Sequence, residues 1–166
     1  MTSSCSLASE FEMLTRSRQA KKEIQVRRDD GLDPLHFAVQ EGNTEVVNLL
    51  IWKGADVDGK DDDGWAPLHW AVDFGHREIA AILVSNNADV NTADKLGWTP
   101  LHKSVDLQQR DLVDMLITNG SDVNFKAYDG LTPLNRAINR KKTGEIVELL
   151  RKHGAKTSTQ LKTEGK

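Results

Sequence analysis

The loop Gly54–Lys60 has residue types that could cradle a phosphate group. It reads G-A-D-V-D-G-K and matches the first seven positions of the phosphate-binding pattern G-x-x-x-x-G-K-[ST]. The eighth position needs a hydroxyl to ligate magnesium, but Asp61 stands there. Asp62 and Asp63 follow directly, and their negative charges would repel a phosphate. The loop therefore predicts no nucleotide site.

The same acidic run could suggest a calcium loop. An EF-hand needs acidic residues at its first, third and fifth positions and a glycine at the sixth. Counted from Asp56, the fifth position is Lys60; counted from Asp61, Gly64 already occupies the fourth. Neither register fits, so the run predicts a solvated hairpin tip and no metal site.

A histidine recurs at His36, His69 and His102. Equivalent positions on neighbouring packed helices lie about 10 Å apart, whereas zinc holds histidine nitrogens at about 2 Å. These histidines are therefore not expected to share one ion. Cys5 is the single cysteine and has no histidine near it in the sequence, so it is not expected to be a nucleophile. These patterns predict no catalytic residue, no metal and no cofactor.

The prolines show how all of these residues must be positioned. The four prolines of the chain are 33 residues apart, and each lies in a similar phrase. The phrases are G-L-D-P-L-H from Gly31, G-W-A-P-L-H from Gly64, G-W-T-P-L-H from Gly97 and G-L-T-P-L-N from Gly130. A fixed period of this length marks stacked structural repeats. Such arrays present an extended surface instead of a closed pocket, which favours binding over catalysis.

Within residues 61–93 the pattern predicts two short helices. Pro67 suits the first turn of a helix, because its missing N–H would have no partner there in any case. Gly75 ends that helix and Asn87 ends the next, since both residue types tolerate the left-handed conformation. Neither helix can bury its apolar face alone, so each must stack on its neighbours. The inner apolar residues are Leu68, Ala71, Val72, Ile79, Ile82 and Leu83.

The phrases T-P-L-H and G-A-D-V, together with the 33-residue period, resemble the ankyrin repeat family. The resemblance implies an all-α solenoid of stacked helix–turn–helix units joined by β-hairpin loops. It also implies that the recurring histidines bond to the backbone of an adjacent repeat. The expected repeats are residues 28–60, 61–93, 94–126 and 127–157.

The later repeats depart from this pattern. Gln108 stands where the first two repeats end their first helix with glycine, which should cost about 1 kcal/mol. The fourth repeat has one extra residue near Lys141 and Lys142, and its basic residues, Arg136 and Arg140 among them, suggest a polar terminal cap. Residues 158–166 are expected to be a disordered tail.

Residues 1–27 precede the first repeat, whose apolar outer face needs cover. Leu7, Phe11 and Leu14 share one face of a predicted helix, with acidic residues early and basic residues late. The pattern favours a capping helix. The alternative left open is that this segment, with its basic stretch Arg16–Arg28, binds a partner or directs nuclear import.

Composition and charge narrow the class of protein. No run of 18 apolar residues exists and no secretory signal precedes the repeats, so the chain is expected in the cytoplasm and also in the nucleus, away from membranes. Residues 28–93 carry 4 basic and 13 acidic side chains, whereas residues 127–166 carry 9 basic and 4 acidic ones. This asymmetry should bias which partner surface approaches.

In ankyrin proteins the hairpin tips and the first-helix face form a concave binding surface. Large aromatic side chains, which are common binding anchors, recur along this edge of the chain with acidic residues beside them. A monomer that binds a protein segment with mixed basic and apolar residues is predicted. Phe37, Trp52 and Trp70 are instead expected to pack internally. The predicted binding residues are Asp62, Asp63, Trp65, Asp73, Phe74, Lys95, Leu96, Trp98, Leu107 and Tyr128.

Two hairpins also resemble sites of the asparaginyl hydroxylase that modifies ankyrin repeats. Asn91 follows Asp89-Val90, and Asn124 follows Asp122-Val123. Each has a leucine eight positions before it. Both asparagines are therefore candidates for hydroxylation.

The predicted function is a non-enzymatic protein–protein interaction module, acting as an adaptor, scaffold or regulatory binder. A narrower version is an inhibitor resembling the inhibitor-of-NF-κB family, which would mask a basic segment of a transcription regulator. From another class comes nucleic-acid or acidic-surface binding through the basic fourth repeat. This alternative is disfavoured because the basic residues lack interleaved aromatic ones and the other repeats repel phosphate.

Overall fold

The structure, a computed structural model, describes residues 31–140 and 144–164, and these residues form nine helices and no strand. Eight helices form four pairs, and one more follows alone. This confirms the predicted all-α solenoid. The pairs are α2 (Pro34–Gln40) with α3 (Thr44–Trp52), α4 (Pro67–Asp73) with α5 (Arg77–Ser85), α6 (Pro100–Asp106) with α7 (Arg110–Thr118), and α8 (Pro133–Asn139) with α9 (Gly144–Lys152); the last helix is α10 (Ser158–Glu164).

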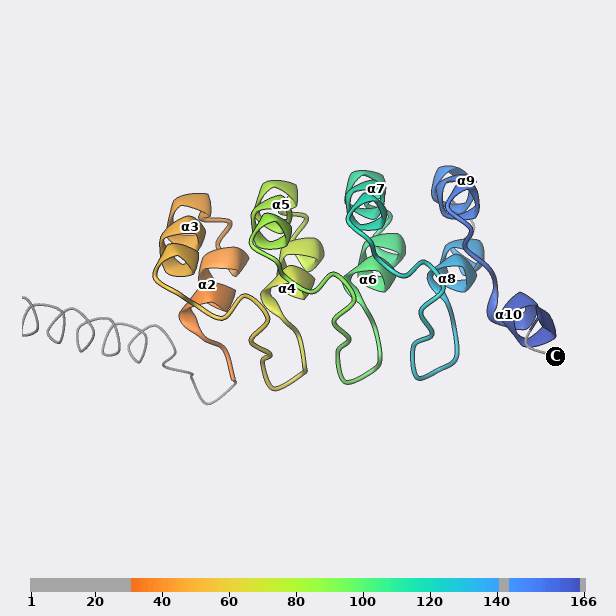
Figure 1. Cartoon of the computed structure of the whole chain (residues 1–166), viewed down its shortest axis with the longest axis horizontal. Helices are drawn as coiled ribbons and strands as arrows, with labels where there is room; N and C mark the ends of the chain where they lie inside the picture. Colours follow the sequence, from red (N-terminus) through yellow and green to blue (C-terminus); the bar gives the residue numbers. More distant parts are fainter. Residues whose placement is uncertain (1–30, 141–143, 165–166) are drawn as a thin grey trace, which may run out of the picture.

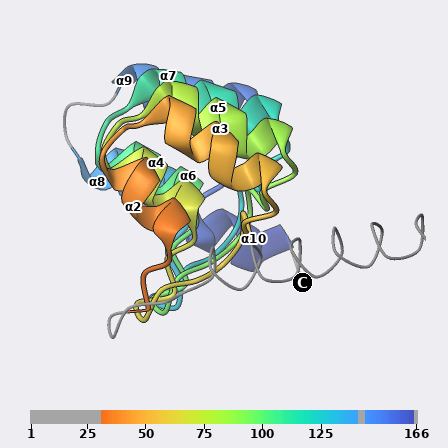
Figure 2. The same ribbon diagram turned by 90° about the vertical axis from the view of Figure 1, so that its left-hand side faces the viewer.

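The pairs stack side by side in two layers (Figure 1). Helices α2, α4, α6 and α8 form the inner layer, and α3, α5, α7 and α9 form the outer layer. Seen along the stack in Figure 2, the helices of each layer nearly superimpose. Each helix packs against its pair partner and against the equivalent helix of the next pair. None of the helices described is long and apolar enough to cross a membrane.

The loops between pairs project beyond the inner layer as narrow hairpins (Figure 1). Neighbouring hairpins are joined by single backbone bonds: Lys95 N donates to Asp63 O at 3.1 Å, and Tyr128 N donates to Leu96 O at 3.1 Å. Such isolated bonds do not make a ladder, so the expected β-hairpin loops carry no strand among the described residues.

Stacking creates one continuous apolar core. Leu35, Leu68, Leu101 and Leu134 recur every 33 residues in the inner layer and are at most 1% exposed. The outer layer contributes side chains that are equally buried, among them Ile79, Leu83, Leu116 and Leu150. Because each leucine lies between two repeats, no single repeat could form this core alone.

Each inner helix starts with a proline, and in three of them a histidine two residues later joins neighbouring repeats. Its Nδ1 faces the backbone N–H of the residue before the proline, at 3.2 Å in the case of His69 and Ala66. Its Nε2 bonds to a backbone oxygen of the next repeat, which confirms the expected structural role. The Nε2–oxygen distances are 3.1 Å from His36 to Trp65, 2.9 Å from His69 to Trp98, and 3.3 Å from His102 to Leu131.

Two residues other than glycine hold the left-handed conformation at helix ends. Gln108 has φ of 59° and follows α6, where Gly75 follows α4 with φ of 71°. Asn87 has φ of 64° after α5. Asparagine adopts this region more readily than glutamine does, so Gln108 is the more strained of the two.

A disordered tail was expected at residues 158–166, but Ser158–Glu164 form helix α10, and residues 165–166 lie outside the described residues. The helix begins with a capping box in which Gln160 N donates to Thr157 Oγ1 at 3.3 Å and Thr157 N donates to Gln160 Oε1 at 2.8 Å. Ser158 N also donates to Asn135 Oδ1 at 2.8 Å, which ties α10 to α8. These bonds satisfy backbone N–H groups at the start of the helix, which explains why the segment is helical.

Helix α10 follows α9 after a link that is too short to form another hairpin. Twelve positions separate Gly120 from Thr132, but only three separate Gly154 from Thr157. The backbone of Lys156 in this short link makes two hydrogen bonds to the preceding repeats. Its N–H donates to Asn124 Oδ1 at 2.7 Å, and its carbonyl accepts from Thr132 Oγ1 at 2.8 Å.

Trp52 does not pack internally as expected, because its side chain is 80% exposed. It ends α3 at a position that holds Ser85, Thr118 and Lys152 in the other outer helices, all of them exposed. This position faces solvent in every repeat. The predicted capping helix in residues 1–27, with Cys5, lies outside the described residues, as do Lys141 and Lys142.

Candidate protein-binding surface

The hairpins are held by aspartate side chains that accept backbone N–H groups. Asp61 Oδ1 accepts from Asp63 N at 2.9 Å and from Trp65 N at 2.8 Å. Asp94 Oδ1 accepts from Trp98 N at 2.8 Å in the same way. These internal hydrogen bonds hold each of the two hairpins in shape, and they fix its tryptophan just before the start of the next inner helix.

The two tryptophan rings are each covered by a cation from the following repeat. Lys103 Nζ lies 3.6 Å from the centre of the Trp65 ring. The Arg136 guanidinium carbon lies 3.8 Å from the centre of the Trp98 ring. Cations over indole rings are attracted by the negative face of the ring. The chain thus supplies internally the cations that a partner was expected to bring.

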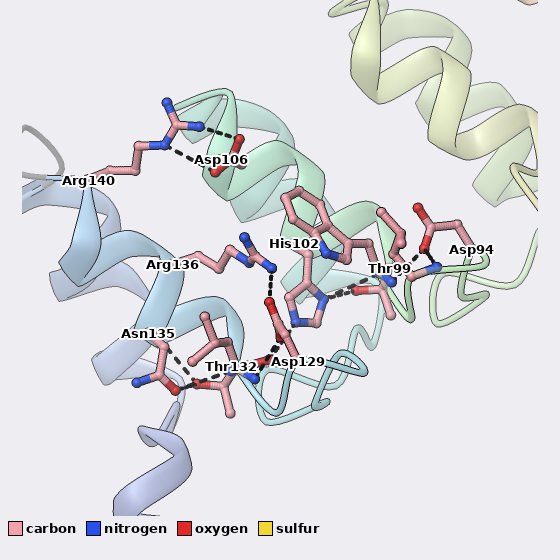
Figure 3. Close-up of polar contacts among 12 residues, drawn as sticks. Asp94, Thr99, His102, Asp106, Asp129, Thr132, Asn135, Arg136 and Arg140 are labelled. Carbon is pink, nitrogen blue, oxygen red and sulfur yellow. Dashed lines mark hydrogen bonds and ion pairs between the residues drawn. The ribbon is translucent and has the colours of Figure 1, made fainter. Parts of the chain in front are cut away.

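The same cations pair with aspartates of the inner layer. Lys103 Nζ lies 3.1 Å from Asp73 Oδ1 and therefore sits between the hairpin and the end of α4. Arg136 pairs with Asp129, as Figure 3 shows. Lys103 and Arg136 are thus each paired with an aspartate of the same chain, whereas Asp62 and Asp63 are exposed.

Arg140 also turns back toward repeat 3. Its Nε donates to Asp106 Oδ1 at 3.1 Å and its Nη2 donates to Asp106 Oδ2 at 2.6 Å (Figure 3). A two-point pair of this kind fixes the guanidinium in direction as well as in place.

Repeat 2 also carries a cluster of aromatic side chains near these ion pairs. Trp70 stacks on Phe74 with ring centres 5.9 Å apart, and Phe74 stacks on His76 at 5.9 Å. Trp70 Nε1 donates to Asp61 Oδ2 at 2.8 Å, so its polar edge is satisfied. Trp70 therefore packs within the chain as expected, while Phe74 remains 46% exposed.

The predicted binding residues fall into two rows on the inner layer. Asp62, Asp63, Lys95, Leu96 and Tyr128 lie exposed on the hairpins, with Leu96 at 65% and Tyr128 at 79% exposure. Phe74 and Leu107 lie at the C-terminal ends of α4 and α6, where Leu107 is 43% exposed. Trp65, Trp98 and Asp73 lie half-buried between the rows. We call these two rows and the side chains between them the inner surface.

The sequence pattern does not single out the groups that cover the tryptophans. Lys103 is not among the predicted binding residues, and Arg136 is predicted only as part of a polar terminal cap. The signal was a spacing of 38 residues, from Trp65 to Lys103 and from Trp98 to Arg136. That spacing is one period plus five residues. It predicts a contact only when the orientation of one repeat relative to the next is known.

Burial controls the charge of the histidines behind the inner surface. It lowers the pKa of His102 from 6.5 to about 4, a shift opposed by the hydrogen bond with Leu131. Burial also lowers the pKa of His69. Both rings are therefore neutral near pH 7, which allows Nδ1 to accept a hydrogen bond while Nε2 donates one.

The first repeat differs because Asp33 precedes its proline. Burial raises the pKa of Asp33, but hydrogen bonds from His36 outweigh this effect and the pKa is lowered overall. The Asp33 carboxylate lies 2.9 Å from His36 Nδ1 and accepts the Leu35 N–H at 2.9 Å. Among the described residues, no cluster of histidine, cysteine, aspartate or glutamate side chains could hold a metal ion.

Asn91 and Asn124, the hydroxylation candidates, join the ends of neighbouring outer helices. Asn91 Oδ1 accepts from Asp122 N at 2.7 Å, and its Nδ2 donates to Gly120 O at 3.2 Å. Asn124 makes the same pair of bonds to Lys156 N and Gly154 O, at 2.7 and 3.2 Å. Both amides thus have a structural role between repeats.

Comparison with known families gives a match that spans most of the chain. A family model described as ankyrin repeats (three copies) matches residues 6–94 and again residues 86–160. A search of curated proteins gave no significant match.

Proposed function

Because the chain belongs to the ankyrin repeat family, we propose that it is an adaptor or regulatory binder that docks another protein on its inner surface. Ankyrin repeats generally mediate protein–protein interaction and are typically not enzymes. The observation that carries the proposal is the pair of exposed apolar rows, Leu96 and Tyr128 on the hairpins and Phe74 and Leu107 on the helix ends. Exposed apolar side chains in rows favour a macromolecular partner.

The charges on this surface indicate the chemistry of the partner. Asp62 and Asp63 are exposed on the hairpin of the second repeat, and residues 28–93 carry 13 acidic side chains against 4 basic ones. The tryptophan faces are already covered by Lys103 and Arg136. We therefore expect basic residues of the partner to meet Asp62 and Asp63, and its apolar residues to meet Phe74 and Leu107.

A narrower form of this proposal is a regulatory inhibitor that masks a basic segment of a transcription regulator in the cytoplasm or the nucleus. The acidic first two repeats support it, because they would attract such a segment. Nucleic-acid binding by the fourth repeat has less support, since Arg136 and Arg140 are paired with Asp129 and Asp106.

The binding proposal is tested by affinity capture from cell extract with three forms of the chain. A Phe74→Ala/Leu107→Ala variant should lose partners that the unaltered chain captures, while Trp52→Ala should retain them. Trp52 is a matched control, because it is an exposed aromatic residue on the outer layer. Retention of every partner by the double variant, with a fold shown intact by circular dichroism, would exclude this surface.

We also propose that Asn91 and Asn124 are substrates of an asparaginyl hydroxylase. The support is their place in the D-V-N sequence of two equivalent hairpins. Both side chains are engaged between repeats, so modification would require local opening of the hairpin. Intact-mass measurement on protein from animal cells should show one or two added oxygen atoms, and Asn91→Ala should remove one of them.

A further inference from the structure

Among the described residues, no helix packs over an apolar groove of about 540 Å³ at the front of the stack. It lies on the side of α2 and α3 that faces away from repeat 2. Its apolar lining is Leu32, Pro34, Phe37, Ala38, Val46 and Leu50.

The other repeats show what normally covers this face. Val46 is 38% exposed, whereas its equivalents Ile79, Leu112 and Ile146 are 2 to 3% exposed. Those three lie on α5, α7 and α9, each of which packs against the outer helix of the preceding repeat. Val47, by contrast, is fully buried and so faces the interior of the stack. The groove is therefore shaped to receive an outer helix.

The chain contains a segment with the pattern of such a helix in the right place. The family match begins at residue 6, so it treats residues before the first complete repeat as part of the array. One period before α3 lie residues 11–19. In this register Leu14 corresponds to Val47, and Ile24 corresponds to Val57, Val90 and Val123. Phe11 stands one turn before Leu14 on the same helical face.

The remaining positions of the segment agree with a terminal position in the stack. Glu12, Thr15, Arg16 and Gln19 would lie on the face opposite Leu14, as the solvent side of a cap requires. The same register places Thr2 where the inner helices have their buried leucine, so residues 1–7 lack the pattern of an inner helix.

We propose that residues 11–24 are the second half of an incomplete repeat and cover the groove by packing Phe11 and Leu14 against Val46 and Leu50 of α3. The occupant of the groove is this segment of the chain itself. The array then contains an outer helix at its front without an inner partner. The inner surface is unaffected, so failure of this proposal would leave the binding proposal standing.

The test measures hydrogen exchange of the full chain and of two variants in the segment. In Leu14→Asp, the amides of α3 should exchange about tenfold faster, because a buried leucine stabilises by more than this factor. Exchange in α7 should change less. Thr15→Asp is the matched control and should leave α3 unchanged, since residue 15 lies on the solvent side in the proposed register.

A second measurement applies if Leu14→Asp folds poorly. In the unaltered chain, amides of residues 11–19 should be protected, and Val46→Asp should remove that protection. Equal α3 exchange in Leu14→Asp and Thr15→Asp, or unprotected amides at 11–19, would overturn the proposal. A dimer in sedimentation that Val46→Asp dissociates and Leu14→Asp does not would assign the groove to a second copy.

Discussion

Both layers bury apolar residues between neighbouring repeats, as Leu68 and Leu101 do in the inner layer, but in the inner layer polar side chains also reach across. In the outer layer, fully buried apolar residues such as Leu83 and Leu116 fill the space between helices. In the inner layer, polar groups reach across: His102 bonds to the Leu131 carbonyl, and Arg136 covers Trp98. Apolar burial is insensitive to pH and direction, whereas hydrogen bonds and charges depend on both. Both layers therefore supply apolar cohesion, and the polar contacts of the inner layer also fix the orientation of the inner surface.

The largest expected effect tests apolar burial in the outer layer by creating a cavity there. Leu116→Ala removes a fully buried side chain and should destabilise the protein by about 2–5 kcal/mol. Urea unfolding at pH 7.5 measures the change, and the loss should be the same at pH 5. Met115→Ala is the neighbouring control and should cost less, because Met115 is half-buried. Equal costs would mean that the depth of burial in the outer layer does not set its contribution to stability.

Acidification should weaken the inner layer selectively. The folded pKa of His102 is about 4, below its ordinary 6.5, so the unfolded chain takes up the proton first as pH falls. The stabilisation is therefore complete above about pH 6.5 and is lost progressively toward pH 4, by on the order of 3 kcal/mol in total.

The measurement is the free energy of unfolding at pH 7.5 and pH 4.5. A His102→Asn variant places at this position the residue that repeat 4 has at Asn135. It should be less stable at pH 7.5 but should lose less stability on acidification. An identical pH dependence in both proteins would show that His102 does not couple the inner layer to pH.

The cation–tryptophan contacts should have a smaller effect. Arg136→Gln removes the guanidinium over Trp98, which should cost about 1 kcal/mol and alter tryptophan fluorescence. Arg151 is exposed in the outer layer, so Arg151→Gln should change neither stability nor fluorescence. A loss of the same size in both variants would point to net charge instead of the contact.

The smallest expected change is a gain. Gln108→Gly relieves a left-handed residue at φ of 59° and should stabilise the protein by up to about 1 kcal/mol, less the entropy that glycine adds to the unfolded chain. Asn87→Gly should gain less, because asparagine tolerates this conformation. Thermal unfolding of the two variants side by side decides the order, and a larger gain at Asn87 would contradict it.

The sequence predicts the helices of both layers but not every contact between repeats. The 33-residue period and the apolar spacing predict both sets of helices, and the family resemblance predicts the histidine bonds, because these features repeat in every unit. Lys103 over Trp65 is not predicted, since it depends on a residue five places beyond the period. The prediction that Trp52 packs internally is wrong. It rests on the size of the apolar side chain, whereas the position on the helix faces solvent.

The chain end was misjudged for a related reason. The capping box Thr157–Gln160 can be recognised in the sequence, but it does not lie at the 33-residue spacing that identifies the other helices. The binding role of Phe74 and Tyr128 is a prediction that rests on their exposure at the inner surface.

The direct step from α9 to α10 has a consequence for how long a ligand the array can accommodate. The hairpin that carries Tyr128 is the last one in the described part of the chain, because the link from Gly154 to Thr157 has no room for another. A bound strand running along the tips must terminate or turn away there. Grafting the missing nine residues, the difference between a spacing of twelve and one of three, should therefore add one more hairpin to the row.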